Sequence, residues 1–117
     1  MGVRQFLKRV STPTEVQDRE KLVRYCDAHG LTPIGDVALR RPAKFVGEVT
    51  SLRIVPRAGA PAVEVTVTDG RDAAVAVFLG RGRVRGITPG RRLVVEGVPV
   101  REGAETLVYN PAYELLA

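Results

Sequence analysis

Two kinds of hydrophobic periodicity divide the chain near residue 42. In the first part, residues 13–28 carry apolar residues at helical spacing, on a stripe formed by Val16, Val23 and Cys26. Thr12 and Glu15 have the spacing of a capping box, so a helix should begin there. In the second part, β-branched residues alternate with polar ones between glycines and prolines. We therefore predict an N-terminal helical extension and connector over residues 1–42, and an all-β domain over residues 43–117.

The all-β part contains enough alternating segments for five strands. We predict them at residues 45–55, 62–68, 73–79, 92–100 and 106–110. Gly47 is a candidate for a bend or bulge in the first strand, and residues 56–61 and 101–105 are predicted to be loops. Five strands with a longer link between the third and fourth are typical of a five-stranded OB-fold, a Greek-key barrel. Another small barrel, such as an SH3-like one, is the alternative.

The phase of the alternation predicts which side chains face the barrel interior. In the second strand, Val63, Val65 and Val67 should point inward, and Glu64, Thr66 and Thr68 outward. The third strand is apolar on both faces, so periodicity leaves two phases open. We favour Ala74, Ala76 and Phe78 as the inward set over Val75, Val77 and Leu79. The other face then needs a cover, which the N-terminal helix is placed to provide.

Several short motifs resemble a family of short, stand-alone bacterial OB-fold proteins that are described as nucleic-acid binding. The motifs are Gly47-Glu-Val49, Thr68-Asp-Gly70, Val77-Phe-Leu-Gly-Arg81, Gly86-Ile-Thr-Pro-Gly90 and Tyr109-Asn-Pro-Ala-Tyr113. The strand region is also similar to the wedge OB domain of branch-migrating helicases. The chain contains no phosphate-binding loop of the G-x-x-x-x-G-K-[ST] type, so the resemblance implies a fold and a binding function without a motor.

Composition and charge narrow the class of partner. Eighteen basic and 13 acidic residues give a net charge of +5, and 15 of the basic residues are arginine. Arginine favours phosphate contacts because its guanidinium offers a planar fork of donors. The single cysteine excludes an internal disulfide and fits a reducing compartment. The longest apolar run is seven residues and no secretory signal is recognisable, so we expect a cytoplasmic protein.

No constellation of residues predicts catalysis, a cofactor or a metal site. The sequence has one histidine, His29, and its two serines, Ser11 and Ser51, lie in no recognisable nucleophile motif. Asp69 and Gly70 form an Asp-Gly pair that is followed by two polar residues, Arg71 and Asp72. We therefore interpret Asp69 and Asp72 as turn-forming residues rather than metal ligands. We therefore expect a protein that is not an enzyme.

The strongest candidate for a binding surface is a stretch without acidic residues. Between Asp72 and Glu96, 23 residues contain five arginines and no carboxylate. Further arginines flank the predicted inter-strand loops, and Tyr109 is the best candidate for stacking on a base. The predicted nucleic-acid-binding residues are Arg53, Arg57, Arg81, Arg83, Arg85, Arg91, Arg92, Arg101 and Tyr109. The expected partner is single-stranded DNA or RNA, bound mainly by charge. The alternative function is a protein-interaction adaptor that docks on a larger assembly through its helix or barrel.

Overall fold

The computed structural model describes residue 24 and residues 29–116 of the chain, and the predicted N-terminal helix with its apolar stripe lies outside the described residues. A short 3-10 helix, η1, spans Ile34–Asp36. The seven strands are β1 (Ala43–Arg57), β2 (Ala60–Thr68), β3 (Ala73–Leu79), β4 (Arg92–Gly97), β5 (Pro99–Glu102), β6 (Glu105–Tyr109) and β7 (Ala112–Leu115).

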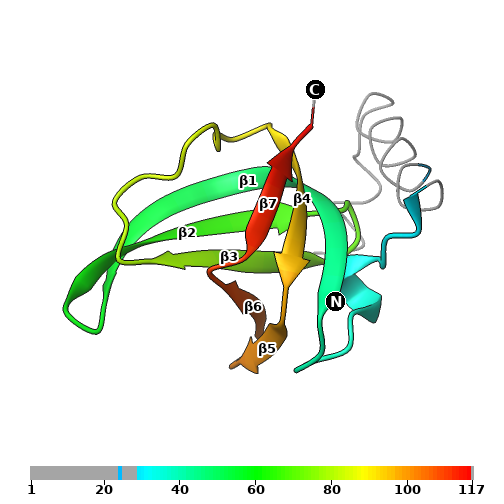
Figure 1. Ribbon diagram of the computed structural model, residues 1–117, viewed down its shortest axis with the longest axis horizontal. Coiled ribbons are helices and arrows are strands. Elements are labelled where there is room, and N and C mark those ends of the chain that lie inside the picture. Colours follow the sequence, from blue (N-terminus) through cyan, green and yellow to red (C-terminus); the bar gives the residue numbers. More distant parts are fainter. Residues whose placement is uncertain (1–23, 25–28, 117) are drawn as a thin grey trace, which may run out of the picture.

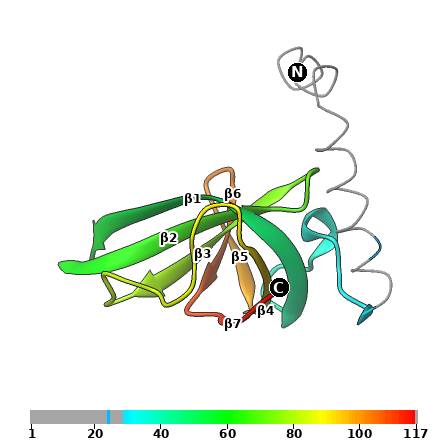
Figure 2. The same ribbon diagram turned by 90° about the horizontal axis from the view of Figure 1, so that it is seen from above.

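These strands form one strongly curled sheet (Figures 1 and 2). Their order is β5-β6-β3-β2-β1-β4-β7. All neighbours are antiparallel except β3 and β6, which run parallel. Only Val98 separates β4 from β5, so the chain itself joins the two sides of the curled sheet. This connectivity is consistent with an OB-fold.

The C-terminal half differs from the prediction in two places. The predicted strand over residues 92–100 is divided at Val98, because β4 pairs with β1 whereas β5 pairs with β6. The chain must bend where it changes from one partner strand to another, and the alternation of side chains does not indicate such a bend. The prediction also omitted β7, whose four residues after Pro111 pair with β4.

The segment over residues 56–61 is a hairpin rather than the predicted loop. The turn consists of Ala58 and Gly59, whose φ angles of 51° and 79° are those of a two-residue hairpin. Pro56 lies opposite Pro61 in the ladder. In such a hairpin, the residue pair next to the turn, here Arg57 and Ala60, is joined by backbone hydrogen bonds. The following pair, Pro56 and Pro61, is not. The missing N–H groups of the two prolines therefore cost the ladder nothing.

The irregularity expected at Gly47 occurs a few residues later. The register between β1 and β2 shifts between Val49 and Ser51, which places the bulge at Thr50. Gly47 instead permits a close approach of two strands, since a Cβ atom there would lie 3.1 Å from the Cβ of Val67. The predicted bulge position is therefore wrong, but the glycine is needed within the curled part of β1.

The predicted inward residues of β2 and β3 are confirmed. Val63, Val65 and Val67 are fully buried, together with the favoured set of Ala74, Ala76 and Phe78. They share one core with residues of the other strands and of the β3–β4 loop, including Phe45, Val49, Val84, Ile87, Leu93, Val95 and Val108. On the outer face, Val75 and Val77 are also buried, in a second cluster with Ala62 and Leu107. Neighbouring strands thus supply cover for the outer face of β3.

A buried carboxylate is one of the groups that hold the connector before β1 to the barrel. Asp69 accepts hydrogen bonds from the N–H groups of Arg71 and Asp72 within its own turn, at 3.0 and 2.9 Å. Its second oxygen accepts from the N–H of Ile34 at 3.0 Å. Ile34 packs into the core, whereas Leu39 of the same connector is 41% exposed. The turn-forming role of Asp69 is therefore confirmed, and it extends to η1.

Candidate nucleic-acid interface

The acid-free stretch contains the loop from β3 to β4, residues 80–91, which we call the arginine loop. It runs over the top of the barrel in Figure 1. Its apolar residues Val84 and Ile87 are 6% and 5% exposed and belong to the main core. Arg81, Arg83 and Arg85 are exposed beside these two buried residues, so the loop is held to the core on one side and charged on the other.

Backbone contacts hold the arginine loop at further points. The hydroxyl of Tyr113 donates a hydrogen bond to the carbonyl oxygen of Arg85 at 2.9 Å. The N–H of Gly90 donates to the carbonyl oxygen of Val49 at 2.8 Å, and the N–H of Val49 donates to the carbonyl oxygen of Arg91 at the same distance. These bonds join the loop to β7 and β1, so its arginines project from a defined backbone.

Five predicted arginines lie on or beside this loop, and they differ in their contacts. Arg81, Arg83 and Arg85 are exposed, and none of them forms an ion pair with another described residue. Arg91 donates a hydrogen bond from its Nε to the carbonyl oxygen of Leu116 at 3.2 Å. Arg92, the first residue of β4, lies 3.7 Å from the carboxylate of Glu48. The exposed, unpaired charge is therefore concentrated in the first half of the loop.

A second group of predicted residues lies on the outer face of β1 and β2 and is paired with carboxylates. Arg53 and Arg57 each lie 2.9 Å from an oxygen of Glu64, one on either oxygen. The side chain of Glu64 is only 12% exposed. Hydrogen bonding from Arg53, followed by that from Arg57, lowers the pKa of Glu64 despite partial burial. The same contact with Glu64 raises the pKa of Arg57.

Tyr109 belongs to the same network. Its hydroxyl accepts a hydrogen bond from Arg57 at 2.9 Å and donates a short one to Glu102. The guanidinium carbon of Arg57 also lies 5.6 Å from the centre of the tyrosine ring. The hydrogen bond to Glu102 raises the pKa of Tyr109. The outer face of β1, β2 and β6 thus carries a closed network of side chains, which we call the outer-face network.

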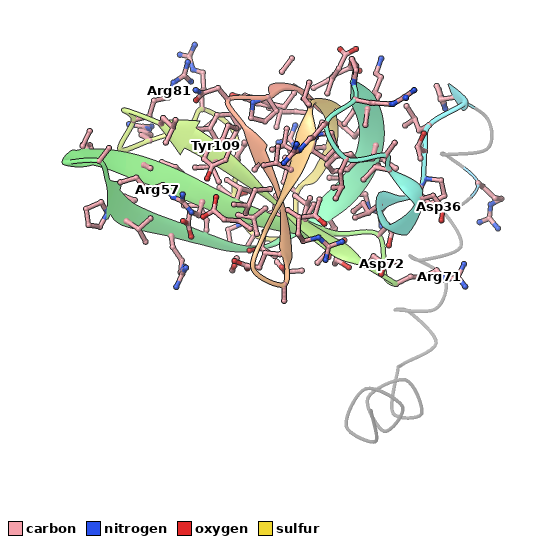
Figure 3. The ribbon with its side chains drawn as sticks, turned by 90° about the horizontal axis from the view of Figure 1, so that it is seen from below. Asp36, Arg57, Arg71, Asp72, Arg81 and Tyr109 are labelled. Carbon is pink, nitrogen blue, oxygen red and sulfur yellow. The ribbon has the colours of Figure 1, made fainter. Side chains whose placement is uncertain are left out.

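Arg101 lies apart from both groups. It lines a groove of about 410 Å³ between the connector and the turn that joins β5 to β6, together with Leu39 and Asp72. Figure 3 shows Asp72 and Arg81 at opposite ends of the molecule. The structure therefore divides the predicted binding residues among three places, and only the arginine loop brings several exposed arginines together.

One further feature was not singled out from the sequence as a binding site. A hollow of about 490 Å³ lies next to the start of the arginine loop, where β3 ends and β7 begins. Its lining consists of Phe78, Leu79, Arg81, Asn110, Pro111, Ala112 and Tyr113. The Asn-Pro pair between two tyrosines is the only sequence signal, and it does not reveal that these residues meet the end of β3.

The described residues contain no group of three or more potential metal-ligating side chains. No helix within the described part of the chain has the length and apolar character needed to cross a membrane.

Comparison with known proteins supports the fold alone. No protein-family model and no curated protein matches this sequence. Among solved structures, the fold is similar to a chain in the crystal structure of the S. pombe Stn1–Ten1 complex, with a TM-score of 0.53 and 20% sequence identity. The match covers 65% of this chain and 58% of that one, so this chain spans less than two-thirds of its neighbour's length. The likeness is consistent with the OB-fold indicated by the strand connectivity.

Proposed function

We propose that this chain is a cytoplasmic, non-enzymatic protein that binds single-stranded nucleic acid through its arginine loop. The observation that carries the proposal is the exposure of Arg81, Arg83 and Arg85 on a loop whose backbone is fixed by the core. No carboxylate occurs between Asp72 and Glu96 to neutralise them. Phosphates that contact these guanidinium groups release their condensed counterions, and this release drives binding.

The outer-face network is a weaker candidate for the same role. A phosphate that approached Arg53 or Arg57 would have to displace Glu64, which already occupies both guanidinium groups at 2.9 Å. Removing one partner of a partly buried ion pair leaves the other charge without compensation, which is costly. The path of the nucleic acid is therefore proposed to follow the arginine loop rather than Tyr109 and its neighbours.

Binding by charge predicts little sequence preference and a strong dependence on salt. If about 3 to 5 phosphates are neutralised, log K should fall against log salt with a slope of about −2 to −3.5 for a single strand. An increase from about 50 to 200 mM salt should then weaken binding roughly 15- to 130-fold. Fluorescence anisotropy with a labelled 12-residue thymidine strand measures this slope.

The triple variant Arg81→Ala, Arg83→Ala, Arg85→Ala tests the assignment. It should flatten the slope by up to about 2, since three phosphate contacts are lost. A control that removes the same charge elsewhere is Arg24→Ala, Arg41→Ala, Arg71→Ala, which changes three exposed arginines away from the loop. Equal slopes for the loop variant and the parent protein would refute the proposed interface. Loss of slope in both triple variants would show that only net charge matters.

A protein-docking role is the second candidate, and one observation favours it. Ile54 is 60% exposed on the part of β1 that extends past the pairing with β4. An exposed apolar residue on a strand with a free edge is a common feature of docking surfaces. Copurification from lysate with and without nuclease separates the two functions. A protein retained after nuclease treatment, and lost with Ile54→Ser, would support docking.

A further inference from the structure

The hollow at the end of β3 combines a charged residue with a lining of both polar and apolar side chains. Arg81 is exposed at its edge and extends away from the barrel in Figure 3. The remaining lining comes from β3, from β7 and from the two residues between β6 and β7. A volume of about 490 Å³ is within the range of small-molecule sites. A phosphate on Arg81 would therefore place the adjoining part of a nucleotide next to the hollow.

Asn110 presents two hydrogen-bond donors at this hollow. Its backbone has a φ of 48°, a left-handed conformation that asparagine tolerates better than most residues. Its Oδ1 accepts a hydrogen bond from the N–H of Leu79 at 2.9 Å. Because only the oxygen can accept, this bond fixes the orientation of the amide. The Nδ2 group carries two N–H donors, and no other described residue accepts from them.

Tyr113 gives the hollow an aromatic wall that is held in place. Its ring contacts the ring of Phe78 edge to face, with the centres 5.7 Å apart and the planes at 81°. Its hydroxyl is fixed by the hydrogen bond to the carbonyl oxygen of Arg85. Pro111, which is buried, also lines the hollow beside it. Flat aromatic and apolar surfaces of this kind suit the stacking of a nucleobase.

We propose that this hollow receives one unpaired nucleobase of the bound strand, against the half-buried ring of Tyr113, while the adjoining phosphate contacts Arg81. The inference rests on the proposed function and names the site of base contact within it. A carbonyl oxygen or ring nitrogen of the base accepts from the Nδ2 of Asn110. All four bases carry such acceptors, so this contact adds affinity with little selectivity. Base contact thus occurs at the end of β3 rather than on Tyr109.

A comparison of two strands with equal charge tests this site. The probes are a 12-residue thymidine strand and a 12-residue abasic strand, which carry the same phosphates. Stacking and hydrogen bonding of one base should make the parent protein bind the thymidine strand at least about 5-fold more tightly. Asn110 is the only asparagine in the sequence, so its side-chain amide is one distinct pair of NMR signals. These signals should shift with the thymidine strand and not with the abasic strand.

Two matched variants test whether the preference for the thymidine strand depends on this hollow. Ala112 is exposed and lines the hollow, so Ala112→Leu should fill it without a change in charge. This variant should lose the preference for the thymidine strand and keep the affinity for the abasic one. The control is Ala104→Leu, the same substitution at the exposed turn between β5 and β6, which should keep the preference.

The possible results distinguish failure of the proposed base site from failure of the proposed nucleic-acid binding. Equal binding of both strands by the parent protein, with unshifted Asn110 signals, would overturn the base site and leave the proposed function intact. A preference that survives Ala112→Leu would also overturn it, because the base would then be held elsewhere. Absence of binding to either strand would refute the proposed function, and the base site with it.

Discussion

The substitution Asp69→Asn should destabilise the fold by removing one acceptor from a buried carboxylate. Asp69 is 6% exposed and serves three N–H donors, two in its own turn and that of Ile34 in the connector. Asparagine has one oxygen in place of two. In one orientation of the asparagine amide, its NH₂ group faces the N–H of Ile34; in the other, it faces the N–H groups of the turn. Either way, at least one backbone donor is left without an acceptor.

The size of this effect follows from the contacts that are lost. A hydrogen bond to a charged group contributes about 1.5–3 kcal/mol, and an unsatisfied buried donor costs about 1–3 kcal/mol. These ranges overlap in part, because both describe the same N–H group, so we expect a loss of about 2–4 kcal/mol. With an unfolding entropy of about 2.1 cal/mol/K per residue, this lowers the melting temperature by roughly 8–16 °C.

Thermal unfolding followed by circular dichroism measures the loss, with Asp72→Asn as the matched control. Asp72 is exposed, and its carboxylate accepts none of the hydrogen bonds described above, so the control should melt within a few degrees of the parent protein. Amide hydrogen exchange should also be faster at Ile34 in the Asp69→Asn variant. A melting temperature within about 4 °C of the parent, with Ile34 still protected, would refute the assigned role of Asp69.

Three further predictions concern a turn, a loop glycine and an ion pair. Ala58→Asn should raise the free energy of unfolding by about 0.5–1 kcal/mol, because asparagine tolerates the positive φ of this turn better than alanine, and urea unfolding measures the gain. Gly86→Ala should lower it by about 1–3 kcal/mol, since φ is 79° there and a methyl group would meet a leucine of β7. The control Gly82→Ala has open space and should change the stability by less than about 1 kcal/mol. The hydrogen bond from Arg53 lowers the pKa of Glu64 in the folded state. The ionised Glu64 therefore stabilises the fold at pH values above its unfolded pKa of about 4.3, and this contribution is lost as the pH falls through the lower folded pKa. Glu64→Gln should therefore flatten the acid limb of a plot of melting temperature against pH, and an unchanged limb would contradict this.

The alternation of side chains predicts the core of β2 well because one face of this strand lies on the core and the other carries polar residues. Val63, Val65 and Val67 could be placed without a structure for this reason. In β3 both faces are apolar and buried, so alternation alone leaves the inward set undecided. The same pattern fails between β4 and β5, since pairing with a new neighbour leaves the alternation of side chains unchanged. Pro56 and Pro61 favour the prediction of a loop, because a sequence does not show which ladder positions lack hydrogen bonds.

The candidate site was predictable in part. The charge of the arginine loop follows from the missing carboxylates alone, whereas the pairing of Arg53 with Glu64 depends on register. A two-residue turn at residues 58 and 59 places these two side chains opposite each other, so the turn was the signal that could have revealed the pair. No comparable signal brings Asn110 next to Leu79, because this contact depends on the parallel pairing of β3 with β6.

The anchoring of the arginine loop by Val84 and Ile87 has a consequence for how the surface can change. Fixing the backbone of a residue costs about 1–2 kcal/mol of conformational entropy, and in this loop that loss occurs during folding, before any ligand arrives. The alternating positions 81, 83 and 85 carry no packing of their own. Their charge can therefore be increased, reduced or reversed by substitution while the loop keeps its shape, which makes affinity and stability separately adjustable properties of this small barrel.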